Sequence, residues 1–543
     1  MHMMDTPLLL TSFLNRAERF FHSKKIYSRT SATTIHEFTY KDYVKRTRRL
    51  ADALTKLGMK QGMKVGTYAW NHHRHLEAYF AVPCAGAVLH MINIRLSPPE
   101  HIAYVINHAE DEILLIDDNL VPLIAPIVSQ LKTVKHFIIM GDAVAVETLP
   151  IPNALSYEAL LAEADEHFTF PEDLDENTPA GMCYTSATTG MPKGVVYTHR
   201  SIVLHSLAAG LADSIAICES DVVLPVVPMF HANAWGLPFA SVAFGSTQVL
   251  PGPMFTPQLL LELFDVYKVT LTAGGVPTIW LGVLQEQRQN PRDLSSMRLI
   301  VCGGSASPLG LVRGFEQELN IPYMTGYGMT ETSPLVSLST YLTHMQDYTD
   351  DEKMNVRITQ GMTMPLIDTR IVNENGEVPW DGKTMGELTI RGPWIANAYY
   401  QDERTEEAFK DGWLYTGDIA VMTTDGYIKI TDRTKDLIKS GGEWISSVEL
   451  ENALMSHPKV FEAAVIAIPH EKWLERPLAC VVAKPEFKDS ITKEELLESL
   501  QQQFHKTWIP DDIVFIDEVP KTSVGKFLKA KLREDLKEYR IQV

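Results

Sequence analysis

The chain is poor in cysteine, and its cysteines are not spaced as in a metal site. Five cysteines are scattered along 543 residues without any Cys-x-x-Cys pair, at Cys84, Cys183, Cys218, Cys302 and Cys480. This spacing indicates neither a zinc site nor a disulfide framework. We therefore expect reduced, buried thiols, as in a reducing compartment.

Long apolar runs are also missing. The first 21 residues contain only a three-leucine run and so lack the apolar core of a signal peptide. The sequence contains no stretch of 18 apolar residues, which a transmembrane helix would need. These two absences predict a cytoplasmic protein without a transmembrane segment.

Basic charge is scarce relative to acidic charge. The 49 Lys and Arg residues against 68 Asp and Glu residues give a net charge of -19 and a pI near 5.4. A nucleic-acid-binding protein would normally show a basic patch or a high pI, so we expect no nucleic-acid partner. The length and the 45% hydrophobic content are those of a globular protein with several domains.

The hydrophobic pattern predicts an α/β fold. Helical periodicity in residues 40–59 alternates with short apolar runs such as residues 64–70 (KVGTYAW) and 112–117 (EILLID), which is typical of largely parallel sheets. From about residue 366 to 433, short runs joined by Asn-Gly and Asp-Gly turns predict a β-rich subdomain. Residues 434–543 predict a small α+β domain. We expect a large N-terminal domain of αβ-layered sheets over residues 1–433, followed by this C-terminal domain.

One short stretch is unusually rich in hydroxyl and glycine residues. Residues 184–201 read YTSATTGMPKGVVYTHRS and hold one lysine, Lys193. The P-loop pattern would need glycine before the lysine and Ser or Thr after it, whereas Pro192 and Gly194 stand there. Consecutive amides can still form a concave nest for an anion. A flexible linker is the alternative interpretation of the same composition.

A second stretch ends an apolar run in two glycines. The sequence MRLIVCGGSASP breaks at Gly303, Gly304 and Ser305 before a helical pattern begins. Ligands of open α/β sheets lie outside such strand ends, although a tight turn would give the same sequence.

Seven motifs follow one another along the chain: YTSATTGMPKGV, PMFHANAWG, GGSASP, GYGMTETSP, YTGD, DRTKDLIKSGGEWIS and PKTSVGKFLK. In this order they resemble the core motifs of the adenylate-forming (AMP-binding) acyl-CoA synthetase superfamily, over residues 10 to 532. Within it, the chain looks most like bacterial medium- and long-chain fatty-acyl-CoA synthetases. The resemblance implies a ligase that uses ATP, Mg²⁺ and CoA. A carboxylate and ATP would give acyl-AMP and pyrophosphate, and CoA would then displace AMP to give a thioester.

The resemblance also implies a nucleotide site. Thr330 would bind the α-phosphate, Glu331 would hold Mg²⁺, Tyr327 would stack on adenine, and Asp418 with Arg433 would bind the ribose. The remaining residues implied for ATP or AMP binding are Thr185, Ser186, Thr188, Thr189, Gly190, Lys193, Gly303, Gly304, Ser305, Gly326 and Gly328. Without the resemblance, a Thr-Glu pair is more often a helix start and the aspartate an Asx-turn residue. Ala187 stands where relatives commonly carry glycine.

The acyl and CoA sites are implied in the same way. Lys526 would bridge the carboxylate and the α-phosphate, so that the C-terminal domain must be mobile, with Lys435 as the hinge. The catalytic set implied is Lys526, Thr330, Glu331 and His231. The residues implied for acyl and CoA binding are His231, Asn233, Trp235, Lys439, Ser440, Gly441, Gly442 and Trp444. Trp235 is expected either to gate an acyl tunnel or simply to pack in the core.

Several alternatives remain at this stage. The acid could be an aryl acid or a short sulfur-containing acid, because one methylene in an apolar pocket discriminates by only about 1–3 kcal/mol. A nonribosomal adenylation module would usually keep an aspartate near PMFHANAWG, which is not seen there. A luciferase-type oxygenase has no support from any motif, whereas a non-catalytic nucleotide sensor of the same fold remains an alternative. The resemblance also implies a homodimer and leaves room for peripheral membrane contact.

Overall fold

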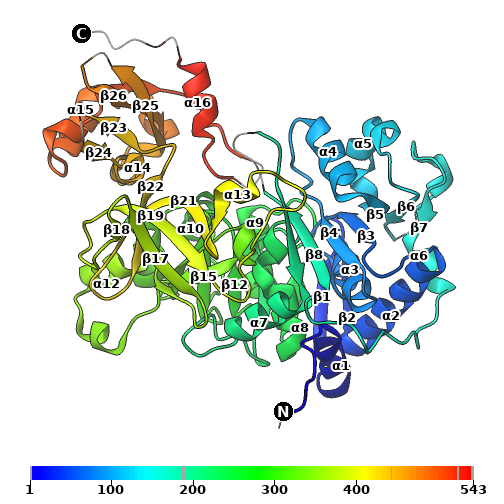
Figure 1. Ribbon diagram of the computed structural model, residues 1–543. Coiled ribbons are helices and arrows are strands. Elements are labelled where there is room, and N and C mark those ends of the chain that lie inside the picture. The colour runs from blue at the N-terminus through cyan, green and yellow to red at the C-terminus, as the bar shows by residue number, and fades with distance from the viewer. Residues whose placement is uncertain are drawn as a thin grey trace.

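A computed structural model describes residues 3–142, 144–185, 190–441, 443–470, 472–522, 525–537 and 539. Within these residues the strands form four sheets, of nine, seven, six and five strands. Figure 1 shows the orange and red C-terminal part seated on the yellow strands, away from the blue and cyan N-terminal sheet.

The two large sheets are mostly parallel. The nine-stranded sheet has the order β16-β15-β14-β13-β12-β10-β11-β1-β2, and the seven-stranded sheet has the order β7-β6-β5-β3-β4-β8-β9. In chain order the bounds are β1 Lys25–Arg29, β2 Ile35–Thr39, β3 Lys64–Tyr68, β4 Val88–Met91, β5 Asp111–Asp117, β6 His136–Met140, β7 Leu155–Ser156, β8 Pro179–Tyr184, β9 Gly194–Thr198, β10 Val222–Pro225, β11 Thr247–Leu250, β12 Leu271–Ala273, β13 Leu299–Gly303, β14 Tyr323–Gly328, β15 Leu335–Leu338 and β16 Met362–Thr363.

Helices cross between these strands, as parallel pairing requires. Their bounds are α1 Thr11–Phe20, α2 Tyr40–Lys56, α3 His73–Cys84, α4 Pro99–Ala109, α5 Val121–Ile124, α6 Tyr157–Ala162, α7 His199–Ala209, α8 Leu237–Phe244, α9 Pro257–Val266, α10 Pro277–Gln289, α11 Leu309–Arg313 and α12 Asp350–Arg357. Helix α2 illustrates why they begin where they do. Thr39 and Asp42 form a capping box, in which each side chain accepts a hydrogen bond from the other's backbone N–H.

Residues 368–433 form the six-stranded antiparallel sheet, with one short helix, α13 Thr405–Ala408. Its strands are β17 Asp368–Asn373, β18 Gly376–Glu377, β19 Gly386–Arg391, β20 Phe409–Lys410, β21 Trp413–Met422 and β22 Ile428–Arg433. The side chains of this sheet join the same buried core as the N-terminal helices, a core that extends from Leu10 to Ile428. The predicted β-rich region therefore packs as part of the large N-terminal unit.

The C-terminal residues build a separate small α+β unit. Its strands are β23 Ile438–Ser440, β24 Glu443–Ile445, β25 Val460–His470, β26 Leu474–Ala483 and β27 Asp512–Phe515, and its helices are α14 Ser447–Met455, α15 Lys493–Gln501 and α16 Lys529–Asp535. Two buried clusters of its own, within residues 438–532, pack the two faces of this sheet. The α/β fold class predicted from the sequence is confirmed. The boundary at residues 433 and 434 and the mobility of the second unit stay predictions.

Candidate active site

The carboxyl ends of β13 and β14 leave no room for side chains between them. Gly303 and Gly326 are register partners on these parallel strands. A Cβ atom on Gly303 would lie 2.5 Å from the carbonyl oxygen of Gly326 and 2.8 Å from Cη2 of Trp235. A Cβ on Gly328 would lie 1.9 Å from the carbonyl oxygen of Pro334. The glycines therefore let the backbone segments and one indole approach closely at a strand end, where ligands of such sheets bind.

Three of the predicted nucleotide residues lie together beside this strand end. The Tyr327 hydroxyl donates to Oδ2 of Asp418 at 2.6 Å, and Arg433 Nε lies 2.6 Å from the other carboxylate oxygen. Asp418 and Arg433 face each other across β21 and β22, and Asp418 is buried. Burial, and then the Asp418 charge, raises the pKa of Tyr327, so its hydroxyl stays a donor. The Asp418 carboxylate likewise raises the pKa of Arg433.

A second polar group lies at the base of the predicted phosphate loop. Lys193 Nζ donates to the Tyr399 hydroxyl at 2.7 Å, and this hydroxyl donates to Oε1 of Glu331 at 2.6 Å. Lys193 Nζ also lies 4.0 Å from that carboxylate oxygen. Burial lowers the pKa of Lys193, while the Glu331 charge opposes that shift. The lysine and the glutamate predicted for phosphate and Mg²⁺ are thus joined through a tyrosine hydroxyl.

The turn that carries Glu331 is held by backbone contacts. Tyr197 donates its hydroxyl hydrogen to the carbonyl oxygen of Thr330 at 2.8 Å, and the Ala396 N–H donates to the carbonyl oxygen of Glu331 at 2.8 Å. Thr330 and Glu331 are both buried. The backbone of Thr330, predicted to bind the α-phosphate, and of Glu331, predicted to hold Mg²⁺, is therefore held by a side chain of β9 and by the segment before Tyr399.

The base of the loop is closed by two hydrogen bonds between Thr185 and Lys193. The Thr185 N–H donates to the carbonyl oxygen of Lys193 at 2.9 Å, and the Lys193 N–H donates to Oγ1 of Thr185 at 3.1 Å. Gly190 has a φ of 75°, a conformation that glycine adopts readily. The remaining predicted loop residues, Ser186, Thr188 and Thr189, lie outside the described residues, as does Ala187.

Sequence reasoning missed two residues of this group, Tyr399 and Arg404. Arg404 Nη1 donates to the carbonyl oxygen of Met191 at 3.0 Å, and its Nε pairs with Asp402 at 2.8 Å. Tyr399 bridges Lys193 and Glu331, as described above. Both lie in the segment ANAYYQDERTEE, which showed no motif. Their proximity to the loop results from the packing of the six-stranded sheet, so no local signal could have revealed it.

The C-terminal unit contributes Lys526 to the same place. Its Cε lies 3.4 Å from the position that a Cβ on Gly304 would occupy. Burial, followed by the Arg433 charge, lowers the pKa of Lys526 to about 8, while Asp418 and Glu331 oppose this shift. Burial and the charge of Lys526 lower the pKa of His231 to about 4, so this imidazole is neutral at pH 7. Residues from the first motif to the last therefore converge on one site.

The segment that carries Asn233 and Trp235 is strained. Residues 232 to 235 have φ angles of 43°, 57°, 48° and 55°, in the left-handed region that residues other than glycine rarely adopt. Asn233 is 1% exposed, and within the described residues neither its Oδ1 nor its Nδ2 has a hydrogen-bond partner. Such strain and unpaired buried groups cluster at functional sites. This turn places the Trp235 indole in contact with Gly303.

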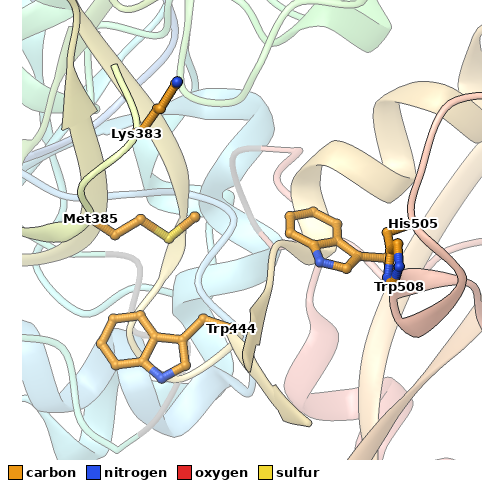
Figure 2. Close-up of a pocket in the computed structure, with 5 residues that line it drawn as sticks. All are labelled: Lys383, Met385, Trp444, His505 and Trp508. Atoms are coloured by element: carbon orange, nitrogen blue, oxygen red, sulfur yellow. The ribbon is translucent and has the colours of Figure 1, made fainter. Parts of the chain in front are cut away.

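The predicted residues Lys439 and Ser440 make hydrogen bonds to strand β26 of the C-terminal unit. The Lys439 N–H donates to Oε2 of Glu475 at 2.7 Å, and Oγ of Ser440 accepts from Arg476 Nη1 at 3.2 Å. Gly441 has a φ of 60°, and Gly442 lies outside the described residues. An open pocket of about 390 Å³ lies between the two units and is lined by Lys383, Met385, Trp444, His505 and Trp508. Figure 2 shows these five side chains.

Two further predicted residues, Ser305 and Lys435, each lie two residues after the end of a strand. Ser305 is exposed at the end of β13. Burial, and then the charge of Arg433, lowers the pKa of Lys435, which lies two residues after the end of β22. Its role as a hinge stays a prediction.

The chain matches the models of one enzyme family along most of its length. Residues 16–400 match the family described as AMP-binding enzyme, and residues 449–526 match the AMP-binding enzyme C-terminal domain. A long-chain-fatty-acid–CoA ligase of Thermus thermophilus is 50% identical over 99% of this chain and 97% of its own length. A 3-methylmercaptopropionyl-CoA ligase of Ruegeria lacuscaerulensis is 43% identical over 99% of this chain and 98% of its own length. A medium-chain-fatty-acid–CoA ligase of Ectopseudomonas oleovorans is 40% identical over 98% of this chain and 96% of its own length.

Solved structures show the same fold. An anthranilate CoA ligase in complex with anthranoyl-AMP is similar with a TM-score of 0.86, at 24% identity and 98% coverage of both chains. ATP-bound MatB from Rhodopseudomonas palustris is similar with a TM-score of 0.81, at 25% identity, over 98% of this chain and 99% of its own.

Proposed function

The chain belongs to the AMP-binding enzyme family, and we propose that it is an AMP-forming ligase that joins a medium- or long-chain fatty acid to CoA. The observation that carries this proposal is the position of Lys526. Its loop comes from the small C-terminal unit, and its side chain lies against Gly304 under the electrostatic influence of Arg433, Asp418 and Glu331. A cation delivered to a nucleotide site from a second unit is suited to a reaction in which two anions must meet.

In the proposed first step, a carboxylate oxygen of the fatty acid attacks the α-phosphorus of ATP. The bond between the α-phosphorus and the bridging oxygen breaks, and acyl-AMP and pyrophosphate result. Two like charges about 4 Å apart repel by roughly 4 kcal/mol at an effective dielectric constant of 20. Lys526, placed between the two anions, would offset that repulsion. In the second step the sulfur of CoA attacks the acyl carbon, the thiol proton is lost, and AMP leaves.

The phosphate side of the site fits ATP with Mg²⁺. Mg²⁺ commonly takes one or two carboxylates together with phosphate oxygens and water. Glu331 is a buried carboxylate within 4.0 Å of Lys193, so it would hold Mg²⁺ beside phosphates that Lys193 would also contact. Over the described ranges, no group of three or more His, Cys, Asp or Glu side chains is placed to hold a metal alone. This donor set suits a metal that arrives with the nucleotide and supplies positive charge at its phosphates.

The nature of the acid rests on the relatives and on the apolar surroundings of Trp235. Two relatives of high identity are named for long- and medium-chain fatty acids. The 43% identical relative is named for 3-methylmercaptopropionate, so a short sulfur-containing acid is the second candidate. Trp235 lies against Gly303 and packs on the main apolar core. These apolar surroundings support an apolar acid.

A panel of acids tests the proposal. Pyrophosphate release and acyl-CoA formation are measured with ATP, Mg²⁺ and CoA for octanoate, palmitate, 3-methylmercaptopropionate and cinnamate. We expect the highest kcat/KM for octanoate or palmitate. A higher kcat/KM for 3-methylmercaptopropionate or cinnamate would contradict the fatty-acid assignment. ATP binding without pyrophosphate release for every acid would favour a nucleotide sensor.

We also propose that the protein is cytoplasmic and forms a homodimer. Among the helices of the described residues, none is long and apolar enough to cross a membrane. The homodimer is tested by light scattering during size-exclusion chromatography, where a mass near 60.9 kDa at micromolar concentration would contradict it.

A further inference from the structure

Four buried polar residues form a continuous chain between strand β22 and the loop that carries Lys526. They are Asp432, Ser447, Glu451 and Lys529, with exposed fractions of 1%, 0%, 5% and 8%. Buried charges are rare in proteins unless they are paired. None of these residues belongs to the nucleotide site described above, so their burial needs an explanation of its own.

Asp432 connects the large N-terminal unit to the small C-terminal unit. It lies in β22, and its Oδ2 accepts hydrogen bonds from the backbone N–H and from the hydroxyl of Ser447, both at 2.6 Å. Ser447 is the first residue of helix α14. Asp432 precedes Lys435 in the sequence and Ser447 follows it, so this contact joins the two sides of the proposed hinge.

Lys529 continues the chain on the other side of Ser447. Its Nζ donates to Oγ of Ser447 at 2.6 Å and lies 2.6 Å from Oε1 of Glu451. The same oxygen of Glu451 accepts from the backbone N–H of Val465 at 2.7 Å. Despite burial, the charges of Glu451 and Asp432 raise the pKa of Lys529 above its ordinary value. The ammonium group is therefore charged at neutral pH, and it contacts Glu451 directly and Asp432 through a serine.

The position of Lys529 in the sequence links these four hydrogen-bonded residues to the loop that carries Lys526. Lys529 begins helix α16, three residues after Lys526. The turn before it is closed by hydrogen bonds from Thr522 N–H to the carbonyl oxygen of Lys526 at 2.7 Å and from Leu528 N–H to that of Pro520 at 2.7 Å. These two hydrogen bonds tie Lys526 and Leu528 to the segment before the turn, so the direction in which Lys526 points depends on where its flanking residues are attached. Lys529 attaches one end to α14 and β22.

We propose that Lys529 is a positioning residue for acyl-AMP formation: through Glu451, Ser447 and Asp432 it fixes the direction in which the loop presents Lys526 to the nucleotide site. This inference rests on the proposed function, in which Lys526 acts in the first step. A catalytic group must be held within about 0.5 Å of its productive position by supporting residues. The buried chain supplies that support across the boundary between the two units.

The test compares two half-reactions in Lys529→Met, Lys529→Arg and the control Lys531→Met. Lys531 lies on the same helix, but it is 48% exposed and pairs with Asp535 on the surface. Pyrophosphate release with octanoate reports the first half-reaction, and acyl-CoA formation from supplied octanoyl-AMP and CoA reports the second. We expect Lys529→Met to lower kcat of the first at least tenfold. The KM for ATP and the second half-reaction should stay within threefold of wild type.

The charge-preserving Lys529→Arg should recover most of the lost rate, and Lys531→Met should match wild type. Lys526→Ala with Lys529→Met should be no slower than Lys526→Ala alone, because residues that act as a unit are not additive. Equal losses in both half-reactions of Lys529→Met would overturn the proposal. An additive loss of rate in Lys526→Ala with Lys529→Met would also overturn it.

Removing Lys529 alone leaves Glu451 buried without its cation and can unfold the small unit. A second variant therefore replaces both groups, Lys529→Met with Glu451→Gln. Its thermal melting shows whether the fold is intact, and we expect the same selective loss of the first half-reaction. A folded double variant with a wild-type rate of pyrophosphate release would refute the positioning role. A wild-type protein that releases no pyrophosphate with any acid would instead refute the proposed function.

Discussion

The protonation state of Lys526 should set the alkaline limit of acyl-AMP formation. Its burial beside Gly304 and the charge of Arg433 lower its pKa to about 8. The cation proposed to offset the repulsion between carboxylate and phosphate is therefore mostly present below pH 8 and is lost as the pH rises above it. An ordinary surface lysine, with a pKa near 10.4, would show no such loss below pH 9.5.

The size of the expected rate loss follows from the titration of a single proton on Lys526. At pH 7 about nine tenths of the side chains carry the charge, and at pH 9 about one tenth do, so kcat/KM should fall about tenfold between these values. Removing the side chain, as in Lys526→Ala, restores a repulsion of roughly 4 kcal/mol, which corresponds to about a thousandfold loss of rate. Bound ATP is anionic and raises the pKa of Lys526, so the fall in kcat should lie at higher pH than the fall in kcat/KM.

The assay is initial pyrophosphate release at subsaturating ATP from pH 6.5 to 9.5, for the wild type and for Lys526→Arg. The guanidinium of arginine stays charged throughout this range, so this variant should lack the alkaline fall even if its rate is lower at every pH. Thioester formation from supplied acyl-AMP should not show the fall either. Prior incubation at pH 9.5 with assay at pH 7.5 controls for inactivation. The same alkaline fall in Lys526→Arg would refute the reasoning.

Three substitutions test other parts of the site. Tyr399→Phe removes the hydroxyl that donates to Glu331 at 2.6 Å. The loss of this hydrogen bond costs about 1 kcal/mol, so the KM for ATP should rise about fivefold in steady-state assays. An unchanged KM for ATP would contradict a role of this hydroxyl in ATP binding. Gly303→Ala puts a Cβ 2.8 Å from Cη2 of Trp235 and should destabilise by about 1–3 kcal/mol in denaturant unfolding, whereas Gly310→Ala, with open space around it, should not. Trp235→Ala should change the KM and chain-length preference for fatty acids but not the KM for ATP; an unaltered acid profile would exclude the gate.

The sequence predicted most of the fold because its elements are locally encoded. Helix α2 has both its periodicity and its capping box within residues 39–56, and the apolar runs of β3 and β5 match the buried strands of the structure. The small unit after β22 also has local signals for its helices and strands. Strand order was not predictable in the same way. Strand β1 pairs with β11, about 220 residues away, and neither segment has a sequence feature that indicates its partner.

Residues of the candidate site could be predicted only where they belong to a sequence motif. Asp418, Arg433 and Tyr327 come from three motifs, and the structure brings them within hydrogen-bonding distance. Tyr399 and Arg404 lie in a segment without a motif, and their role depends on a contact with residues about 200 positions earlier. The left-handed turn at residues 232–235 could not be predicted from the sequence either. Ala, Asn and Trp do not favour that conformation strongly enough to indicate it.

Strand β22 explains how two units can share one site. Successive side chains of a strand point to opposite faces, and the last two residues of β22 use this alternation. Arg433 points to Asp418 in the proposed nucleotide site, whereas Asp432 points to Ser447 in the small unit. The position of the nucleotide's charged partners and the direction of the Lys526 loop are thus set by neighbouring residues of one strand. A one-residue slip in β22 would exchange the two side chains and disconnect both contacts together, so the register of this strand is as important to the proposed chemistry as Lys526 itself.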